Sequence, residues 1–155
     1  MTRKFLVVVD DSPEFKAALG YAARRARSTN GRVVLLRALP DSSDEHWSGV
    51  RDEIRRQQRA EAEALLARIG DEAAERSGAP AIFIIEEGDA QDAIRKTVKA
   101  DLDIKILVLA ASAGARGPGP LVSAVLKQGG FHSGRKLPVT IVPGELSEED
   151  LSDLA

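Results

Sequence analysis

The run Phe5-Leu-Val-Val-Val9, followed directly by Asp10-Asp11-Ser12-Pro13, decides the fold of this chain. A continuous apolar run rich in β-branched residues is typical of a strand that is buried on both faces, as in parallel sheets. The acidic residues end the strand, and Ser12-Pro13 predicts the start of a helix, with Ser12 as its N-cap and Pro13 at its first position. A buried strand, a short polar turn and a helix in succession indicate an α/β domain.

The same pattern recurs along the chain. Further strands are expected over residues 33–39, 81–85, 104–110 and 138–142, and helices over 13–29, 50–76, 89–98 and 120–128. Asn30-Gly31 is expected to end the first helix, Asp89 to cap the third, and the long helix to turn a face from Val50 to Ala73 inward. Alternating strands and helices predict a three-layer α/β fold, a five-stranded parallel sheet with helices on both faces and right-handed crossovers.

Length and composition are those of one globular domain. The chain has 155 residues, without an internal repeat, and residues 144–155 hold five acidic residues and no basic one. We therefore expect an α/β domain over residues 1–143 and an acidic C-terminal tail over residues 144–155, disordered or forming a short solvated helix.

Charge and cysteine content exclude several classes of function. The 22 Lys and Arg residues nearly balance the 24 Asp and Glu residues, whereas nucleic-acid binding favours a basic excess. The absence of cysteine excludes disulfides, thiolate catalysis and cysteine-based zinc sites. No apolar run reaches the ~18 residues of a membrane span. We expect a cytoplasmic protein with neither nucleic-acid nor membrane partners.

Two segments that follow expected strands are candidates for a binding site, because ligands of open α/β sheets bind beyond the carboxyl ends of the strands. Asp10 and Ser12 follow the first strand and offer a carboxylate and a hydroxyl, although both also suit a helix cap. The loop Gly114-Ala-Arg116-Gly117-Pro-Gly119 precedes a helix and could bind phosphate through backbone N–H groups and Arg116, or simply connect two elements. Its spacing matches neither Gly-x-Gly-x-x-Gly nor the P-loop.

Four segments resemble the universal stress protein family, in the family's order and spacing: Val7-Val-Val-Asp10-Asp-Ser12, Glu87-Gly88-Asp89, Ile106-Leu-Val-Leu-Ala110 and Leu137-Pro138-Val-Thr-Ile-Val142. The resemblance covers roughly residues 3–143. It implies a sheet of strand order 3-2-1-4-5 and a homodimeric stress-response protein, which in many members binds ATP. For this chain it implies ATP, with or without Mg²⁺, bound with little or no hydrolysis.

The resemblance also implies roles for particular residues. Asp10 would contact the ribose or phosphate region, the backbone of Ala38 and Leu39 the adenine, and the loop after the fourth strand the phosphates. Nucleotide-binding members carry Gly-x2-Gly-x9-Gly-Ser/Thr; Gly114 and Gly117 supply the first half, but Lys127 stands where the third glycine belongs. Counting from Gly119 instead leads to Gly129, followed by Gly130. The predicted nucleotide-binding residues are therefore Asp10, Ser12, Ala38, Leu39, Gly114, Arg116, Gly117, Gly119, Gly129 and Gly130.

Three other functions stay open at this point. The same fold can act as an interaction or signalling module whose crevice binds no nucleotide, which the altered glycine motif favours. A phospho-accepting receiver domain also begins with paired acids, but it needs an aspartate at the end of the third strand, where this chain has Glu86-Glu87. A nicotinamide enzyme needs a glycine fingerprint after the first strand, where this chain has acids and Pro13.

The last expected strand also predicts a partner. Pro138 and Pro143 bracket it, as is tolerated at the edge of a sheet. An uncovered apolar edge favours pairing with a second copy of the chain. We expect a homodimer joined through Val139, Thr140, Ile141 and Val142.

Overall fold

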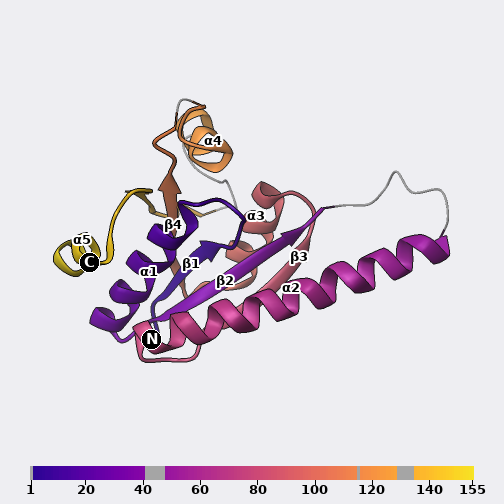
Figure 1. Ribbon diagram of the computed structural model, residues 1–155, viewed down its shortest axis with the longest axis horizontal. Helices are drawn as coiled ribbons and strands as arrows, with labels where there is room; N and C mark the ends of the chain where they lie inside the picture. Colours follow the sequence, from indigo (N-terminus) through magenta and orange to yellow (C-terminus); the bar gives the residue numbers. More distant parts are fainter. Residues whose placement is uncertain (1, 41–47, 115, 129–134) are drawn as a thin grey trace.

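The computed structural model describes residues 2–40, 48–114, 116–128 and 135–155, and its centre is a five-stranded parallel sheet (Figure 1). The order is β3-β2-β1-β4-β5, with every pair parallel. This confirms the predicted fold and differs from the 2-1-3-4-5 order of receiver domains. The strands are β1 (Lys4–Val8), β2 (Arg32–Leu39), β3 (Ile82–Glu87), β4 (Ile104–Ala111) and β5 (Val139–Pro143).

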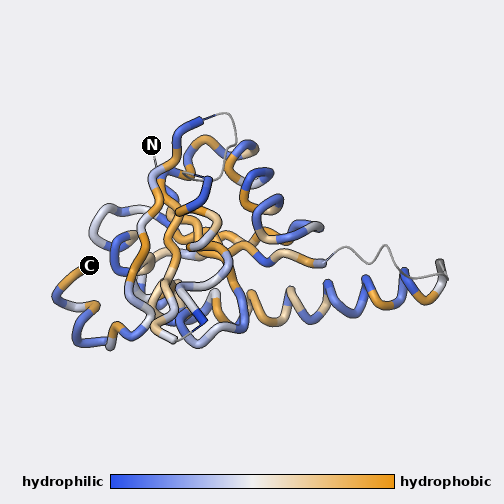
Figure 2. The backbone as a smooth tube through the Cα atoms, turned by 90° about the horizontal axis from the view of Figure 1, so that it is seen from above, coloured by the Kyte–Doolittle hydropathy of each residue, from blue (hydrophilic) through white to orange (hydrophobic). Residues whose placement is uncertain are grey.

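Helices cover both faces of the sheet, and each face has its own apolar core. Side chains of α1 (Phe15–Thr29) and α2 (Ser48–Ser77) pack on one face, and those of α3 (Ala90–Ala100) and α4 (Pro120–Gln128) on the other. Along β1, Phe5 and Val7 belong to the first core, whereas Leu6 and Val8 belong to the second. Figure 2 shows these apolar strands gathered at the centre of the molecule.

Local sequence signals predicted most helix ends, with one error at the start of α1. Asn30 ends α1 in the left-handed conformation (φ 54°), and Asp89 caps α3 by accepting a hydrogen bond from Asp92 N–H at 2.8 Å. Ser12, however, is not the N-cap of α1. Glu14 holds that position without a side-chain cap, and the Ser12 hydroxyl and N–H both donate to the Asp10 carboxylate.

Helix α2 is longer than the sheet that it covers. At about 1.5 Å per residue, its 30 residues span about 45 Å. Its fully buried apolar residues begin only at Ala62, and its first half projects beyond the carboxyl edge of the sheet in both views (Figures 1 and 2). The expectation that Val50 faces inward is therefore wrong: Val50 is 55 % exposed, because no strand lies beneath that part of the helix.

The C-terminal segment contains a helix that packs on the domain. Residues 148–154 form α5 (Glu148–Leu154), whose capping box joins Ser147 and Asp150. Leu151 on this helix is only 2 % exposed and packs against α1. The division into a domain ending at residue 143 and an acidic tail stays a prediction, but α5 is not fully solvated.

Among the described helices, none combines the length and apolarity that crossing a membrane requires.

A half-buried ion pair lies at the amino-terminal edge of the sheet, beside an arginine that donates to three backbone carbonyl groups. Lys4 Nζ lies 2.6 Å from Asp101 Oδ2, and Asp103 N–H donates to Asp101 Oδ1 at 2.9 Å. Arg135 donates to the carbonyl oxygens of Val98, Asp101 and Ile104. Burial alone would raise the pKa of Asp101, but these hydrogen bonds and the charges of Lys4 and Arg135 hold it below its ordinary value.

We expect Asp101→Asn to lower the free energy of unfolding at pH 7 by about 1–2 kcal/mol, since it removes a charged hydrogen bond. A carboxylate whose pKa is depressed by folding stabilises the protein above its unfolded pKa, and this stabilisation is lost as pH falls through the folded pKa. The difference between wild type and Asp101→Asn should therefore shrink below about pH 4. Urea unfolding at pH 7 and pH 3 tests this, and a difference that does not depend on pH contradicts it.

Candidate functional site

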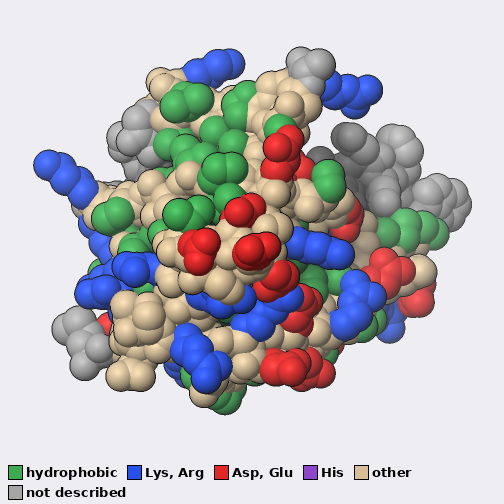
Figure 3. All heavy atoms as spheres, turned by 60° about the vertical axis from the view of Figure 1, so that its left-hand side comes forward, with side chains coloured by type: hydrophobic (Ala, Val, Ile, Leu, Met, Phe, Trp, Pro, Cys, Tyr) green, Lys and Arg blue, Asp and Glu red, His purple; other side chains and the backbone are tan. Residues whose placement is uncertain are grey.

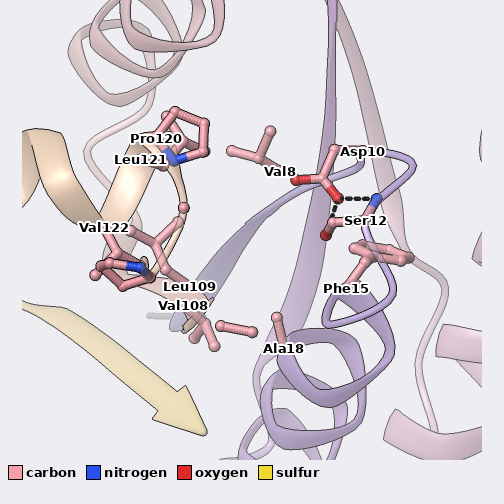
Figure 4. Close-up of a pocket in the computed structure, with 13 residues that line it drawn as sticks. Val8, Asp10, Ser12, Phe15, Ala18, Val108, Leu109, Pro120, Leu121 and Val122 are labelled. Carbon is pink, nitrogen blue, oxygen red and sulfur yellow. Dashed lines mark hydrogen bonds between the residues drawn. The ribbon is translucent and has the colours of Figure 1, made fainter. Parts of the chain in front are cut away.

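The candidate site lies at the carboxyl edge of the sheet, around the end of β1. Strand order reverses at β1, so the chain leaves β1 toward α1 on one face and enters α4 from β4 on the other. Such a switch point is where open α/β sheets bind ligands. The turn after β1 is fixed by Asp10, whose Oδ1 accepts hydrogen bonds from Ser12 N–H at 3.0 Å and from the Ser12 hydroxyl at 2.6 Å (Figure 4).

Two cavities meet at this turn, and Val8 and Asp10 line both of them. The larger, of about 600 Å³, lies over the ends of β1, β2 and β3 and the start of α3. The smaller, of about 60 Å³, lies between β1, α1, β4 and the start of α4 (Figure 4). The larger cavity falls in the range of ordinary ligand pockets, roughly 300–1,000 Å³.

The structure separates the two residues that the resemblance assigned to adenine. Ala38 lines the larger cavity together with Arg37 and Pro40. Leu39 is buried and lines a different hollow, of about 120 Å³, beneath the arginines of α2. The Leu39 carbonyl also accepts a hydrogen bond from Gly88 N–H at 2.8 Å. Only Ala38 therefore has its predicted place beside Asp10.

Arg37 is a site residue that the sequence reasoning missed. Its Nη1 donates to the Val9 carbonyl at 3.0 Å, and its Nη2 lies 3.8 Å from Asp11 Oδ2. The guanidinium thereby braces the end of β1 and forms one wall of the larger cavity. The available signal was an arginine interrupting an otherwise apolar strand, which is unusual unless the charged group has a partner.

Asp89 and Asp92 at the start of α3 also line the larger cavity, which the sequence reasoning did not predict. Asp89 was recognised only as a helix cap, and its Oδ1 is used in that way. Together with Asp10, they give the wall of the cavity three carboxylates, beside the one guanidinium of Arg37. Such a wall suits hydrogen-bond donors, such as sugar hydroxyls and amino groups, better than bare phosphates.

The glycine loop after β4 forms hydrogen bonds within itself. Gly114 N–H donates to Ser112 Oγ at 3.2 Å, Gly117 N–H to the Gly114 carbonyl at 3.2 Å, and Ser112 N–H to the Pro118 carbonyl at 3.0 Å. Gly117 has a φ of 91°, which favours glycine. In this conformation the N–H groups of Gly114 and Gly117 are therefore used within the loop and do not face a ligand.

Of the predicted loop residues, Gly119 alone lines the smaller cavity, beside Pro118 and Pro120. Arg116 is exposed and lines neither cavity. The first turn of α4 lines the cavity through Leu121 and Val122, and N–H groups in a first helical turn lack partners within the helix. The helix dipole adds positive potential there, opposite the Asp10 carboxylate. Gly129 and Gly130 lie outside the described residues.

A metal site finds no support among the side chains that the structure describes, where no cluster of three or more His, Cys, Asp or Glu residues has suitable geometry. Any Mg²⁺ here would arrive with the phosphates of a ligand, as is usual for this ion.

Comparison with known proteins agrees with this architecture. The model of the universal stress protein family matches residues 1–126, most of the chain. The chain belongs to the universal stress protein family. A comparison with curated proteins finds no match.

Solved structures of universal stress proteins have the same fold. UspA from Lactobacillus plantarum is 22 % identical with a TM-score of 0.72, over 90 % of this chain and 97 % of that one. A universal stress protein in complex with cAMP is 17 % identical with a TM-score of 0.66, over 93 % and 98 % of the chains. An Arabidopsis thaliana family protein with AMP bound is 21 % identical with a TM-score of 0.60, over 91 % of both chains.

The glycine loop of this universal stress protein allows a matched test of backbone strain. We expect Gly117→Ala to lower the free energy of unfolding by about 1–2 kcal/mol, because a Cβ disfavours its positive φ even though the space around it is open. Gly114→Ala is the control, since Gly114 is not at positive φ and its Cβ would make an ordinary 3.5 Å contact with Ser112 Oγ. Urea unfolding of both variants tests this, and equal effects would contradict the loop conformation.

Proposed function

We propose that this universal stress protein binds an adenine nucleotide at the end of β1, as a homodimer, and hydrolyses it slowly or not at all. The observation that carries the proposal is the placement of Asp10, Ala38 and the start of α4 around two cavities that share Val8 and Asp10 as lining residues. The larger cavity would take the base and ribose, with Asp10 accepting hydrogen bonds from ribose hydroxyls. The phosphates would lie toward Gly119 and the first turn of α4.

The cofactor that we propose is ATP, with Mg²⁺ carried on its phosphates. The AMP and cAMP in structures of the same fold support an adenine nucleotide. The narrow cavity beside α4 and the inward-turned amides of the glycine loop mean that a triphosphate requires this loop to open. A monophosphate is shorter and requires less opening of the loop. AMP should therefore be tested together with ATP in every binding experiment.

A second function is favoured by the same loop. Its internal hydrogen bonds, and Lys127 in place of the motif's third glycine, suit an interaction or signalling module that binds no nucleotide. We place this module second, because Asp10 and Ala38 still face a cavity of ligand size.

Thermal unfolding with and without ligand tests the first proposal. A ligand at 100 times its Kd adds about 2.7 kcal/mol to the free energy of unfolding. We expect Mg-ATP or AMP at millimolar concentration to raise the melting temperature by several degrees. Asp10→Asn should weaken binding about tenfold, because a hydrogen bond to a charged group is lost.

Asp11→Asn is the matched control for this experiment, since the Asp11 side chain is 89 % exposed and lines neither cavity. It should bind as the wild type does. The absence of any shift with both nucleotides would favour the interaction module.

The homodimer that we propose joins two copies through β5, at the edge of the sheet. Ile141 on this strand is 37 % exposed, and Leu126 on α4, a helix that packs on the same core as Val139 of β5, is 71 % exposed. Figure 3 shows hydrophobic side chains gathered on the upper part of one face, above a band of charged ones. Exposed apolar groups beside an open strand edge support pairing with a second copy.

Light scattering at micromolar concentration should give the mass of two chains. Ile141→Lys should give one chain, because it places two charges in the joined edge. Leu102→Lys is the control, an equally drastic change at a residue 66 % exposed between α3 and β4. A monomeric wild type would exclude the dimer.

A further inference from the structure

The C-terminal helix α5 packs on α1 at a point where α1 has no side chain. Leu151 of α5 lies directly over Gly20, and a Cβ on Gly20 would lie 2.6 Å from Leu151 Cδ1. Glycine inside a helix is less stable than alanine, so its presence there needs a packing reason. The close approach of Leu151 is that reason, and Leu151 is consequently only 2 % exposed.

Arginine side chains from two helices form ion pairs with the same face of α5. Glu148 lies 2.7 Å from Arg76 Nη1 of α2 and 3.3 Å from Arg24 Nη2 of α1. Glu148 and Leu151 are three residues apart, which places them on one side of a helix. The face that packs is therefore defined by the pattern Glu-x-x-Leu. Figure 3 shows the interleaved acidic and basic side chains of this side of the molecule.

The surface that receives α5 extends beyond it. A cavity of about 550 Å³ beside Ala155 is lined by Arg24, Arg27, Ser28 and Arg76. Glu148 pairs with Arg24 and Arg76, whereas Arg27 donates a long hydrogen bond, of 3.5 Å, to the Arg76 carbonyl. We name the surface formed by Gly20, Arg24, Arg27 and Arg76 the Gly20 groove. Its uncovered end is basic and suits carboxylates.

We propose that the Gly20 groove is a docking site for an acidic helix of a partner protein with the pattern Glu-x-x-Leu, and that α5 is its intramolecular occupant. Helix α5 has one buried leucine and four acidic residues, which indicates that the groove binds an apolar side chain flanked by carboxylates. A partner helix with further acidic residues beyond the leucine would also contact Arg27. In this chain the Arg27 side chain donates instead to the backbone carbonyl of Arg76. The proposal does not depend on nucleotide binding.

Displacement is feasible because α5 is held by few contacts. A helix of seven residues is not stable in isolation. Its ion pairs are partly exposed, with the Glu148 side chain 61 % exposed, and such pairs are screened by salt. Helix α5 therefore opens more readily than the core. The opposing factor is the tether, which gives α5 an effective concentration in the millimolar range.

The first experiment frees the groove in the 155-residue chain. Leu151→Asp removes the buried side chain of α5, and Leu154→Asp is the control on the same helix, at a residue 63 % exposed. The probe is a synthetic peptide of residues 144–155, followed by NMR titration. We expect Leu151→Asp to bind it at least about tenfold more tightly than the wild type or Leu154→Asp, since the groove is then open. If Leu151→Asp fails to fold by circular dichroism, Leu151→Ser replaces it.

The second experiment tests the groove itself in the Leu151→Asp background. Gly20→Ala should abolish peptide binding by filling the place of Leu151, whereas Arg68→Gln, an exposed position on α2, should leave it unchanged. A peptide extended by two glutamates after residue 155 should bind about tenfold more tightly, and Arg27→Gln should remove that gain.

Hydrogen exchange in the otherwise unaltered chain supplies a test of α5 itself. Gly20→Ala should speed exchange at the Leu151 N–H, which donates to the Ser147 carbonyl, without speeding exchange in the sheet. Three results would overturn the proposal: no peptide binding by Leu151→Asp at millimolar concentration, equal binding by the wild type, or binding that survives Gly20→Ala. The first result would make α5 a permanently packed helix, and the other two would place the bound peptide outside the Gly20 groove.

Discussion

The burial of β1 on both faces is the constraint on which the rest of the structure depends. β1 pairs with β2 on one side and β4 on the other, and its side chains alternate between two separate cores. A strand in this position cannot be removed without opening both cores. Because strand order reverses at β1, the polar residues that follow it stand where the two halves of the sheet diverge. The position of the candidate site follows from the same burial that stabilises the fold.

The site is more complete on one side than on the other. Toward β2 and β3, Asp10, Arg37 and Ala38 surround a cavity of ligand size. Toward β4, the glycine loop is closed by its own hydrogen bonds, and the adjoining cavity is about ten times smaller. To bind a phosphate chain, the loop would have to break hydrogen bonds that its backbone already forms. The free energy of binding would have to exceed the free energy lost with those hydrogen bonds. In the nucleotide site that we propose, this asymmetry leaves room for the base and ribose, whereas a triphosphate would require the glycine loop to open.

Helix α1 serves both regions of interest. Phe15 and Ala18 on its first turns line the smaller cavity, while Gly20 and Arg24 receive α5. A single rigid element therefore lies between the nucleotide crevice that we propose and the Gly20 groove. The acidic C-terminal segment is held to the domain by the contact of Leu151 with Gly20, by the ion pairs of Glu148 and by a hydrogen bond from Gly144 N–H to the Ala111 carbonyl.

The sequence by itself determined the elements of this protein and their class. Apolar runs marked all five strands, Asn30 and Asp89 marked helix ends, and Asp10 marked the edge of the site, because each signal depends on neighbours within a few residues. Tertiary structure decided the rest. No strand of the sheet lies beneath the part of α2 that carries Val50, so this residue is exposed. The carbonyl of Leu39 accepts a hydrogen bond from Gly88 N–H. Leu151 meets Gly20 across more than a hundred residues. Such contacts arise only when distant segments pack, so no local pattern records them.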